Sequence, residues 1–199
     1  MKEKNGTGFF LKLPYKSTFV YALMTNYHII DEEDIINEEK ILIYLNNNKE
    51  FRSIKIDKER KRYTDEKLDV TIIEIKEQKD NLSNIINYLE LDEEILNFIK
   101  LKRKDFYFNG IYKNASIYLL NCFHEQKIFS SYGLLSDINE YKMQHKCNTN
   151  EGSSGSPIIS VKSKKVIGIH FGHPQSNYQF NIGTFILYQI GRASCRERV

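Results

Sequence analysis

Glycine and serine are concentrated in residues 150–157, which read NEGSSGSP. Gly152 and Gly155 flank two serines, and glycine allows both a sharp backbone turn and the close approach of another chain. Such a turn can aim consecutive backbone N–H groups at one point, as the stabilisation of an oxyanion requires. Ser154 is therefore a candidate nucleophile for acyl transfer. Taken alone, the segment is more often a simple Gly/Ser turn between two strands.

A serine nucleophile needs a base, and the base needs a group that orients it. His28 follows the apolar run 18–25, so a strand would hold its imidazole at a rigid end. Asp69 precedes the apolar run 70–75, where its carboxylate could accept the histidine Nδ1–H and fix the tautomer. Each residue alone is also explained as a packed histidine or a turn-forming aspartate. Together with Ser154 they follow one of the few chain orders known for this triad.

Short apolar runs separated by turn residues dominate the chain and predict an all-β protein. Many short strands with frequent turns are typical of sandwich or barrel architectures. The expected strands cover residues 7–13, 18–25, 40–45, 51–56, 70–75, 116–120, 126–135, 157–161, 165–170 and 183–187. Residues 80–100 fit either a short helix or an irregular connection.

The composition is that of a globular protein, with 41% hydrophobic and 13% aromatic residues. The formal charge of +3 is too small to imply a nucleic-acid or membrane partner. The mixed-sign cluster 57–62 is expected to form a solvated loop. Cys122 and Cys147 do not make a disulfide framework, and no CxxC pair suggests a metal. The first residues lack the apolar core of a secretion signal, which favours the cytoplasm if the natural N-terminus is present.

The tail 190–199, IGRASCRERV, is similar to the translation of a common sequencing-library adapter. We expect the natural reading frame to be lost near Gln189, so that the tail and its Cys195 are an artefact. Genomic DNA that encodes the tail in frame would contradict this interpretation.

Four segments together resemble trypsin/chymotrypsin-fold serine peptidases, most closely the V8-type glutamyl endopeptidases. They are the histidine region 23–30, the aspartate strand 68–73, the nucleophile loop 152–157 and the pocket strand 166–172. The resemblance spans most of residues 6–187 and is loose between 77 and 115. It implies two six-stranded antiparallel β-barrels with the active site in the cleft between them.

The resemblance assigns residues 5–100 to an N-terminal barrel that carries the histidine and the aspartate. It assigns residues 101–189 to a C-terminal barrel that carries the nucleophilic serine. It implies a serine endopeptidase with a His28–Asp69–Ser154 triad and an acyl-enzyme intermediate. The oxyanion hole would be the backbone N–H groups of Gly152 and Ser154. Ser153 departs from the family's usual Asp or Asn, but only its backbone geometry is required. The alternative is a catalytically inactive, protease-like module that binds peptides.

The resemblance also suggests what the pocket prefers. Asn148 stands where trypsins carry an acidic residue, so a basic P1 side chain would meet no counter-charge. Thr149 and His170 match the residues that hold the P1 carboxylate in glutamate-specific relatives, which predicts P1 Glu, with Gln second. Phe171 and Gly172 would pair with the substrate backbone as an added strand. Alternatively, His170 is a strand histidine packed under the pocket.

The remaining expectations are simple. The partner is a peptide or protein substrate, and no cofactor, metal, nucleic acid or membrane is expected for this monomer. His124, His145 and His173 are expected to be surface or structural residues. Because little chain precedes Gly8, the first barrel is expected to lack its opening strand. The family's C-terminal helix would begin near Tyr188, where the suspected adapter starts, so the chain is expected to be truncated at both ends.

Overall fold

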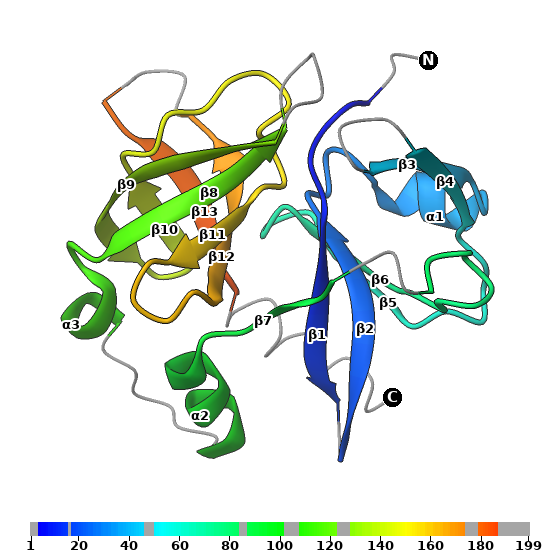
Figure 1. Ribbon diagram of the computed structural model, residues 1–199, viewed down its shortest axis with the longest axis horizontal. Helices are drawn as coiled ribbons and strands as arrows, with labels where there is room; N and C mark the ends of the chain where they lie inside the picture. Colours follow the sequence, from blue (N-terminus) through cyan, green and yellow to red (C-terminus); the bar gives the residue numbers. More distant parts are fainter. Residues whose placement is uncertain are drawn as a thin grey trace.

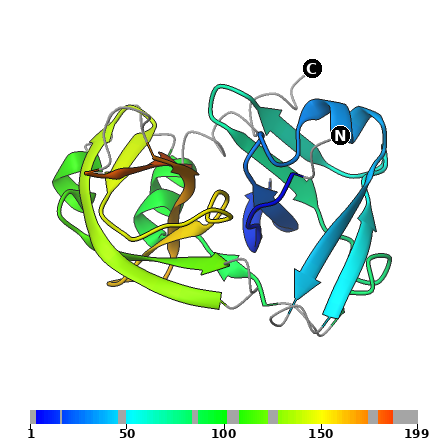
Figure 2. The same ribbon diagram turned by 90° about the horizontal axis from the view of Figure 1, so that it is seen from above.

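The computed structural model describes residues 4–15, 17–45, 50–83, 87–101, 108–122, 128–173 and 179–186. Two β-rich halves lie side by side, with short helices at their edges (Figures 1 and 2). The suspected adapter tail 190–199 and His124 lie outside the described residues. No helix in the described part of the chain is long and apolar enough to cross a membrane.

The C-terminal half is a closed six-stranded barrel in the order β10–β13–β12–β11–β8–β9. Its strands are β8 (Ser116–Cys122), β9 (Ile128–Asn139), β10 (Lys142–His145), β11 (Pro157–Ser160), β12 (Val166–Gly172) and β13 (Asn181–Phe185). Every neighbouring pair is antiparallel. Apolar side chains such as Ile117, Leu119 and Ile169 are fully buried inside. This half confirms a predicted barrel, and β10 is the strand that the sequence did not predict.

The N-terminal half is built on a five-stranded sheet in the order β5–β6–β2–β1–β7. These strands are β1 (Phe9–Tyr15), β2 (Thr18–Thr25), β5 (Arg62–Asp65), β6 (Val70–Glu74) and β7 (Leu89–Glu90), and β7 runs parallel to β1. Side chains of β1 alternate in burial, so Phe9, Leu11 and Leu13 enter the core. This alternation is what an amphipathic strand predicts.

A second closed barrel, which the sequence led us to expect, is not formed by the described residues. β3 (Lys40–Leu45) and β4 (Glu50–Lys55) instead form a separate two-stranded sheet. Ile54 and Ile56 of this hairpin are buried against apolar side chains of the larger sheet, in two small clusters. The hairpin is thus attached by side-chain packing, without the backbone ladder that would close a barrel. The helix α1 (Glu32–Ile36) packs in the same region through Ile35.

Residues 80–100, ambiguous in the sequence, contain both β7 and the helix α2 (Glu93–Leu101), and α3 (Phe108–Tyr112) follows. Asp92 lies just before α2 and is buried. Its carboxylate accepts hydrogen bonds from Tyr112 Oη at 2.6 Å and Ser163 Oγ at 2.5 Å. These bonds fasten the connecting segment to the C-terminal barrel.

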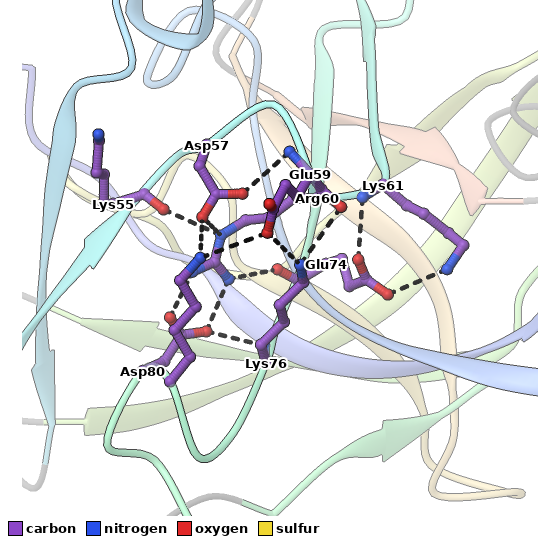
Figure 3. A network of polar contacts seen from close by, with 9 residues as sticks. Lys55, Asp57, Glu59, Arg60, Lys61, Glu74, Lys76 and Asp80 are labelled. Carbon is purple, nitrogen blue, oxygen red and sulfur yellow. Dashed lines mark hydrogen bonds and ion pairs between the residues drawn. The ribbon is translucent and has the colours of Figure 1, made fainter.

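The charged cluster 57–62 is not simply a solvated loop, because Arg60 is only 4% exposed. Its guanidinium makes two hydrogen bonds to the Asp80 carboxylate, at 2.8 and 2.6 Å, and donates to the carbonyls of Lys55 and Glu74 (Figure 3). A buried arginine needs a carboxylate and further acceptors to replace its hydration, and here it has both. The expectation was therefore wrong for Arg60, which ties β4, β6 and the turn after β6 together.

Candidate active site

His28 and Asp69 are brought together by the adjacent strands β2 and β6. His28 lies in the turn after β2, and Asp69 in the turn before β6, whose Thr71 pairs with Thr25. His28 Nδ1 is 2.8 Å from Asp69 Oδ2, and the backbone N–H of His28 donates to Asp69 Oδ1 at 2.9 Å. The Asp69 side chain is buried, whereas that of His28 is 47% exposed. The carboxylate can thus hold the imidazole with its Nε2 available to a partner.

Asp69 occupies an unusual backbone conformation, with φ of +49°. Aspartate tolerates this left-handed region better than most residues, but it still needs support from its surroundings. Asn26 Nδ2 donates to the Asp69 carbonyl at 2.9 Å, and Thr184 Oγ1 of β13 donates to the Leu68 carbonyl at 3.1 Å. Asp65 Oδ1 accepts from the Leu68 N–H at 3.0 Å. Both halves of the protein therefore hold the turn that presents the Asp69 carboxylate.

Ser154 lies in the loop between β10 and β11, and the two glycines of this loop adopt backbone conformations that favour glycine. Gly152 and Gly155 have φ values of +87° and +88°, where other residues are strained. A Cβ on Gly155 would also lie 1.9 Å from the carbonyl oxygen of Thr7. The sequence prediction of a sharp turn with a close backbone approach agrees with this geometry.

The backbone N–H groups on either side of Ser153 differ from most of their neighbours in the loop. Ser153 N–H donates to the Asn150 carbonyl, Ser156 N–H to the Ser153 carbonyl, and Gly155 N–H to the His170 carbonyl, each at 3.0 Å. Within the described residues, the N–H groups of Gly152 and Ser154 have no such acceptor. Two unused N–H groups on either side of one residue are what an oxyanion hole requires.

Ser153, which was expected to matter only through its backbone, also stabilises the loop with its side chain. The residue is fully buried, and its Oγ accepts from the Asn150 N–H at 3.0 Å. A hydroxyl at this position thus supports the turn of the loop.

Phe171 connects the nucleophile loop with His28. Ser154 Oγ donates to the Phe171 carbonyl at 3.2 Å, and no hydrogen bond joins Ser154 to His28 in the described part of the chain. The Phe171 ring meets the His28 ring edge to face, with centroids 6.0 Å apart. Phe171 lies at an irregularity of the ladder between β12 and β13, where His170 pairs with Gly183 and Gly172 with Ile182. Its carbonyl is therefore accessible to groups other than β13.

The expected pocket residues differ in their surroundings. Thr149 Oγ1 donates to Asn181 Oδ1 at 3.0 Å, and Asn181 Nδ2 donates to the Cys147 carbonyl at 2.7 Å. Asn148 is exposed, and its carbonyl accepts from Asn121 Nδ2 at 3.4 Å. Asn181 was not expected from the sequence, because no motif marks it and only the pairing of β13 with β10 brings it here.

His170 is buried and contacts a second buried histidine. His145 Nε2 lies 3.1 Å from His170 Nδ1, and the Cys147 N–H donates to His145 Nδ1 at 3.4 Å. If His145 accepts at Nδ1, its proton is on Nε2 and is donated to His170, which then carries its own proton on Nε2. Burial lowers the pKa of both imidazoles, and for His170 the neighbouring His145 lowers it further. A hydrogen bond to the backbone of Ile182 acts in the opposite direction and raises the pKa of His170.

The sequence expectation for His145 and His173 was a surface or structural role. His145 is fully buried and contacts His170, whereas His173 is exposed. The contact between His145 and His170 was not predicted, because it depends on strand pairing: His145 pairs with Asn181 on β13, and β13 pairs with the strand of His170.

Comparison with known proteins identifies the family. Residues 6–169 match the trypsin-like peptidase domain. No curated protein shows significant sequence similarity to the chain.

Solved structures share the fold at low identity. The serine endoprotease of Yersinia pestis has a TM-score of 0.60 and 10% identity, over 100% of this chain. The chain spans 66% of that protein's length, slightly less than two thirds. The serine protease domain of the Sesbania mosaic virus polyprotein has a TM-score of 0.61 and 16% identity, over 96% of this chain and 88% of that one.

An inactive form of Rv3671c from M. tuberculosis H37Rv has a TM-score of 0.62 and 14% identity, over 98% of this chain and 83% of that one. At these identities the likeness shows a common fold and leaves the V8-type subgroup unsupported. The chain belongs to the trypsin-like peptidase domain family, and this membership supports a serine-type peptidase.

Proposed function

We propose that the protein is a serine endopeptidase in which His28 is the general base, Asp69 orients it and Ser154 is the nucleophile. The observation that carries the proposal is the 2.8 Å contact between His28 Nδ1 and Asp69 Oδ2. It lies beside a loop whose Gly152 and Ser154 N–H groups are unused among the described residues. A base, its orienting carboxylate and two oxyanion donors are the parts that acyl transfer from a peptide requires.

Substrate binding would prepare the nucleophile. The Phe171 carbonyl accepts from Ser154 Oγ in the free protein. If the P1 N–H of an added substrate strand took this acceptor, the hydroxyl could turn towards His28 Nε2. Catalytic hydrogen bonds that form only with substrate are common in this kind of site.

The reaction then proceeds in two steps. Ser154 Oγ attacks the scissile carbonyl while His28 Nε2 takes its proton, and the oxyanion binds to the N–H groups of Gly152 and Ser154. His28 returns the proton to the leaving amine, so the peptide bond breaks and an acyl-enzyme forms. Water, activated by the same histidine, hydrolyses the ester and restores the serine.

For specificity we propose P1 Glu, with Gln second. The tautomer set by His145 puts the proton of His170 on Nε2, and Thr149 provides a hydroxyl. In the free protein Thr149 donates to Asn181 Oδ1 and His170 faces the Ile182 carbonyl, so a P1 oxygen would replace these two acceptors. Both groups can bind an oxygen of an acidic or amide side chain. Because burial favours the neutral imidazole, an ion pair with Glu requires proton uptake, which brings Gln closer to Glu near neutral pH.

Two measurements test this function. A fluorophosphonate probe should label the wild type at Ser154, and Ser154→Ala should abolish both labelling and peptide hydrolysis while keeping the unfolding midpoint. A folded wild type that neither reacts nor cleaves would favour the inactive peptide-binding module. Profiling with a peptide library should show cleavage after Glu and Gln, and strong cleavage after Lys or Arg would contradict the proposed specificity.

A further inference from the structure

Thr7, in the segment before β1, holds two carbonyls of the nucleophile loop. Its Oγ1 donates to the Gly152 carbonyl at 2.7 Å, and its backbone N–H donates to the Ser154 carbonyl at 2.8 Å. Thr7 and Gly152 are 145 positions apart in the sequence. One residue from the N-terminal half thus binds the loop on both sides of Ser153.

These two carbonyls belong to the peptide units next to those that carry the oxyanion donors. The Gly152 carbonyl lies on one side of the Gly152 Cα and the Gly152 N–H on the other, so a fixed carbonyl restricts rotation of that residue. Glycine has no side chain to restrict it otherwise, and its φ of +87° is one of several that it can adopt. The Ser154 carbonyl fixes the far side of the nucleophile in the same way. The Ser153 and Gly155 N–H groups hold the same two peptide planes from their other side, and the Thr7 bonds add to them in keeping the N–H groups of Gly152 and Ser154 aligned.

Thr7 is itself held by the strand that leads to the base. Thr25 Oγ1, near the end of β2 and three residues before His28, donates to the Thr7 carbonyl at 2.8 Å. Thr25 is only 3% exposed. A Cβ on Gly6 would lie 2.0 Å from Ile29 Cδ1, so the segment runs directly against the His28 turn.

The start of the segment has a second anchor. Lys4 Nζ contacts Asp31 at 2.5 Å and Asp34 at 2.9 Å, at the beginning of α1. These ion pairs are partly exposed and contribute modestly. They keep the segment against α1, which follows the His28 turn.

We propose that Thr7 is a positioning residue of the oxyanion hole, which aligns the Gly152 and Ser154 N–H groups and sets the loop relative to His28. The inference rests on the proposed function, because it assumes that these groups bind an oxyanion during catalysis. Thr7 touches no substrate and acts only through the loop.

The test compares Thr7→Val with Thr7→Ser in the full chain. Valine keeps the shape of threonine and removes the donor to the Gly152 carbonyl, whereas serine keeps it. We expect Thr7→Val to lower kcat and kcat/KM together by about ten-fold with KM unchanged, less than the 10²–10³ typical of losing an oxyanion donor outright. Binding of a peptide aldehyde, which places an oxyanion in the hole, should weaken by the same factor, and Thr7→Ser should restore both.

Ser136→Ala is the matched control, since it removes a hydroxyl-to-carbonyl hydrogen bond between β9 and β10. It should leave kcat and aldehyde binding unchanged. The inference would be overturned by a folded Thr7→Val variant with wild-type kcat, including one in which only KM rises.

A readout without catalysis separates this inference from the proposed function. Amide hydrogen exchange of Ser153 and Gly155, whose N–H groups are hydrogen-bonded within the site, should be faster in Thr7→Val than in Thr7→Ser or Ser136→Ala. Faster exchange in a folded protein that has no hydrolytic activity would support the role of Thr7 in positioning the loop and would contradict the proposed peptidase function. Unchanged exchange and kcat in an active enzyme would refute the role of Thr7 alone.

Discussion

The Nε2 atom of His145 lies 3.1 Å from Nδ1 of His170, and both side chains are at most 2% exposed. The pair comes from β10 and β12, which are both neighbours of β13 in the barrel. A P1-binding imidazole would therefore have its proton position set by a second imidazole. Two consequences for pH dependence follow from this contact.

The preference for Glu over Gln at P1 should increase as the pH falls from 7.5 to 5.5. A P1 carboxylate stabilises the protonated form of the buried pair, whereas an amide does not, so Glu binding takes up a proton. One proton changes the ratio of the two kcat/KM values by at most about ten-fold per pH unit. Measuring both substrates on the same enzyme cancels the pH effects that the two reactions share. A ratio that stays constant or falls over this range would contradict the proposed role of His170.

Unfolding should become easier below the ordinary histidine pKa of 6.5. Because burial lowers the folded-state pKa of both residues, their contribution is complete above pH 6.5 and is lost as the pH falls towards the lowered values. The loss is about 1.4 kcal/mol per pH unit for each proton taken up on unfolding. The free energy of unfolding, measured with urea between pH 7 and 5, should fall less steeply with decreasing pH for His145→Phe than for the wild type. An equal dependence on pH in the two proteins would argue against a neutral buried pair.

Asp69→Asn should lower kcat by about 10³–10⁴-fold, because an amide cannot orient and stabilise the imidazolium as a carboxylate does. The side chain remains similar in size, so the unfolding midpoint should change little. Asp57→Asn, which alters a carboxylate paired with Lys79 at 2.6 Å, is the control and should keep full activity. Steady-state kinetics of the two variants decide the matter, and a comparable loss in both would remove the special role of Asp69.

Asp80→Ala should destabilise the N-terminal half by about 3–5 kcal/mol, because it leaves Arg60 buried without its carboxylate. Arg60 and Asp80 are 4% and 3% exposed. Glu59→Ala removes a side chain that is 78% exposed and should leave the midpoint unchanged. Chemical denaturation of both variants is sufficient, and a similar effect of the two would mean that the buried pair contributes nothing of its own.

Local pattern identified much of the fold because strand residues alternate at a fixed period. Residues 7–13 and 18–25 were expected as a hairpin, and the hairpin forms with β1 at Phe9–Tyr15 and β2 at Thr18–Thr25. The short strands β5 and β10 were missed, since strands of four residues carry little periodic signal. The closure of the N-terminal half was overestimated, because whether a hairpin joins a sheet edge depends on tertiary packing.

Residue types and local patterns were enough to identify the available chemistry: a glycine-flanked Ser154, and His28 and Asp69 next to strands that could hold them. These are local features, and adjacent strands convert them into contacts whenever the fold forms. Only the tertiary structure brought Thr7 to the nucleophile loop, His145 to His170, and Asn181 to Thr149. Each of these contacts joins residues far apart in the chain, and their meeting depends on strand register and packing, which no short stretch of sequence encodes.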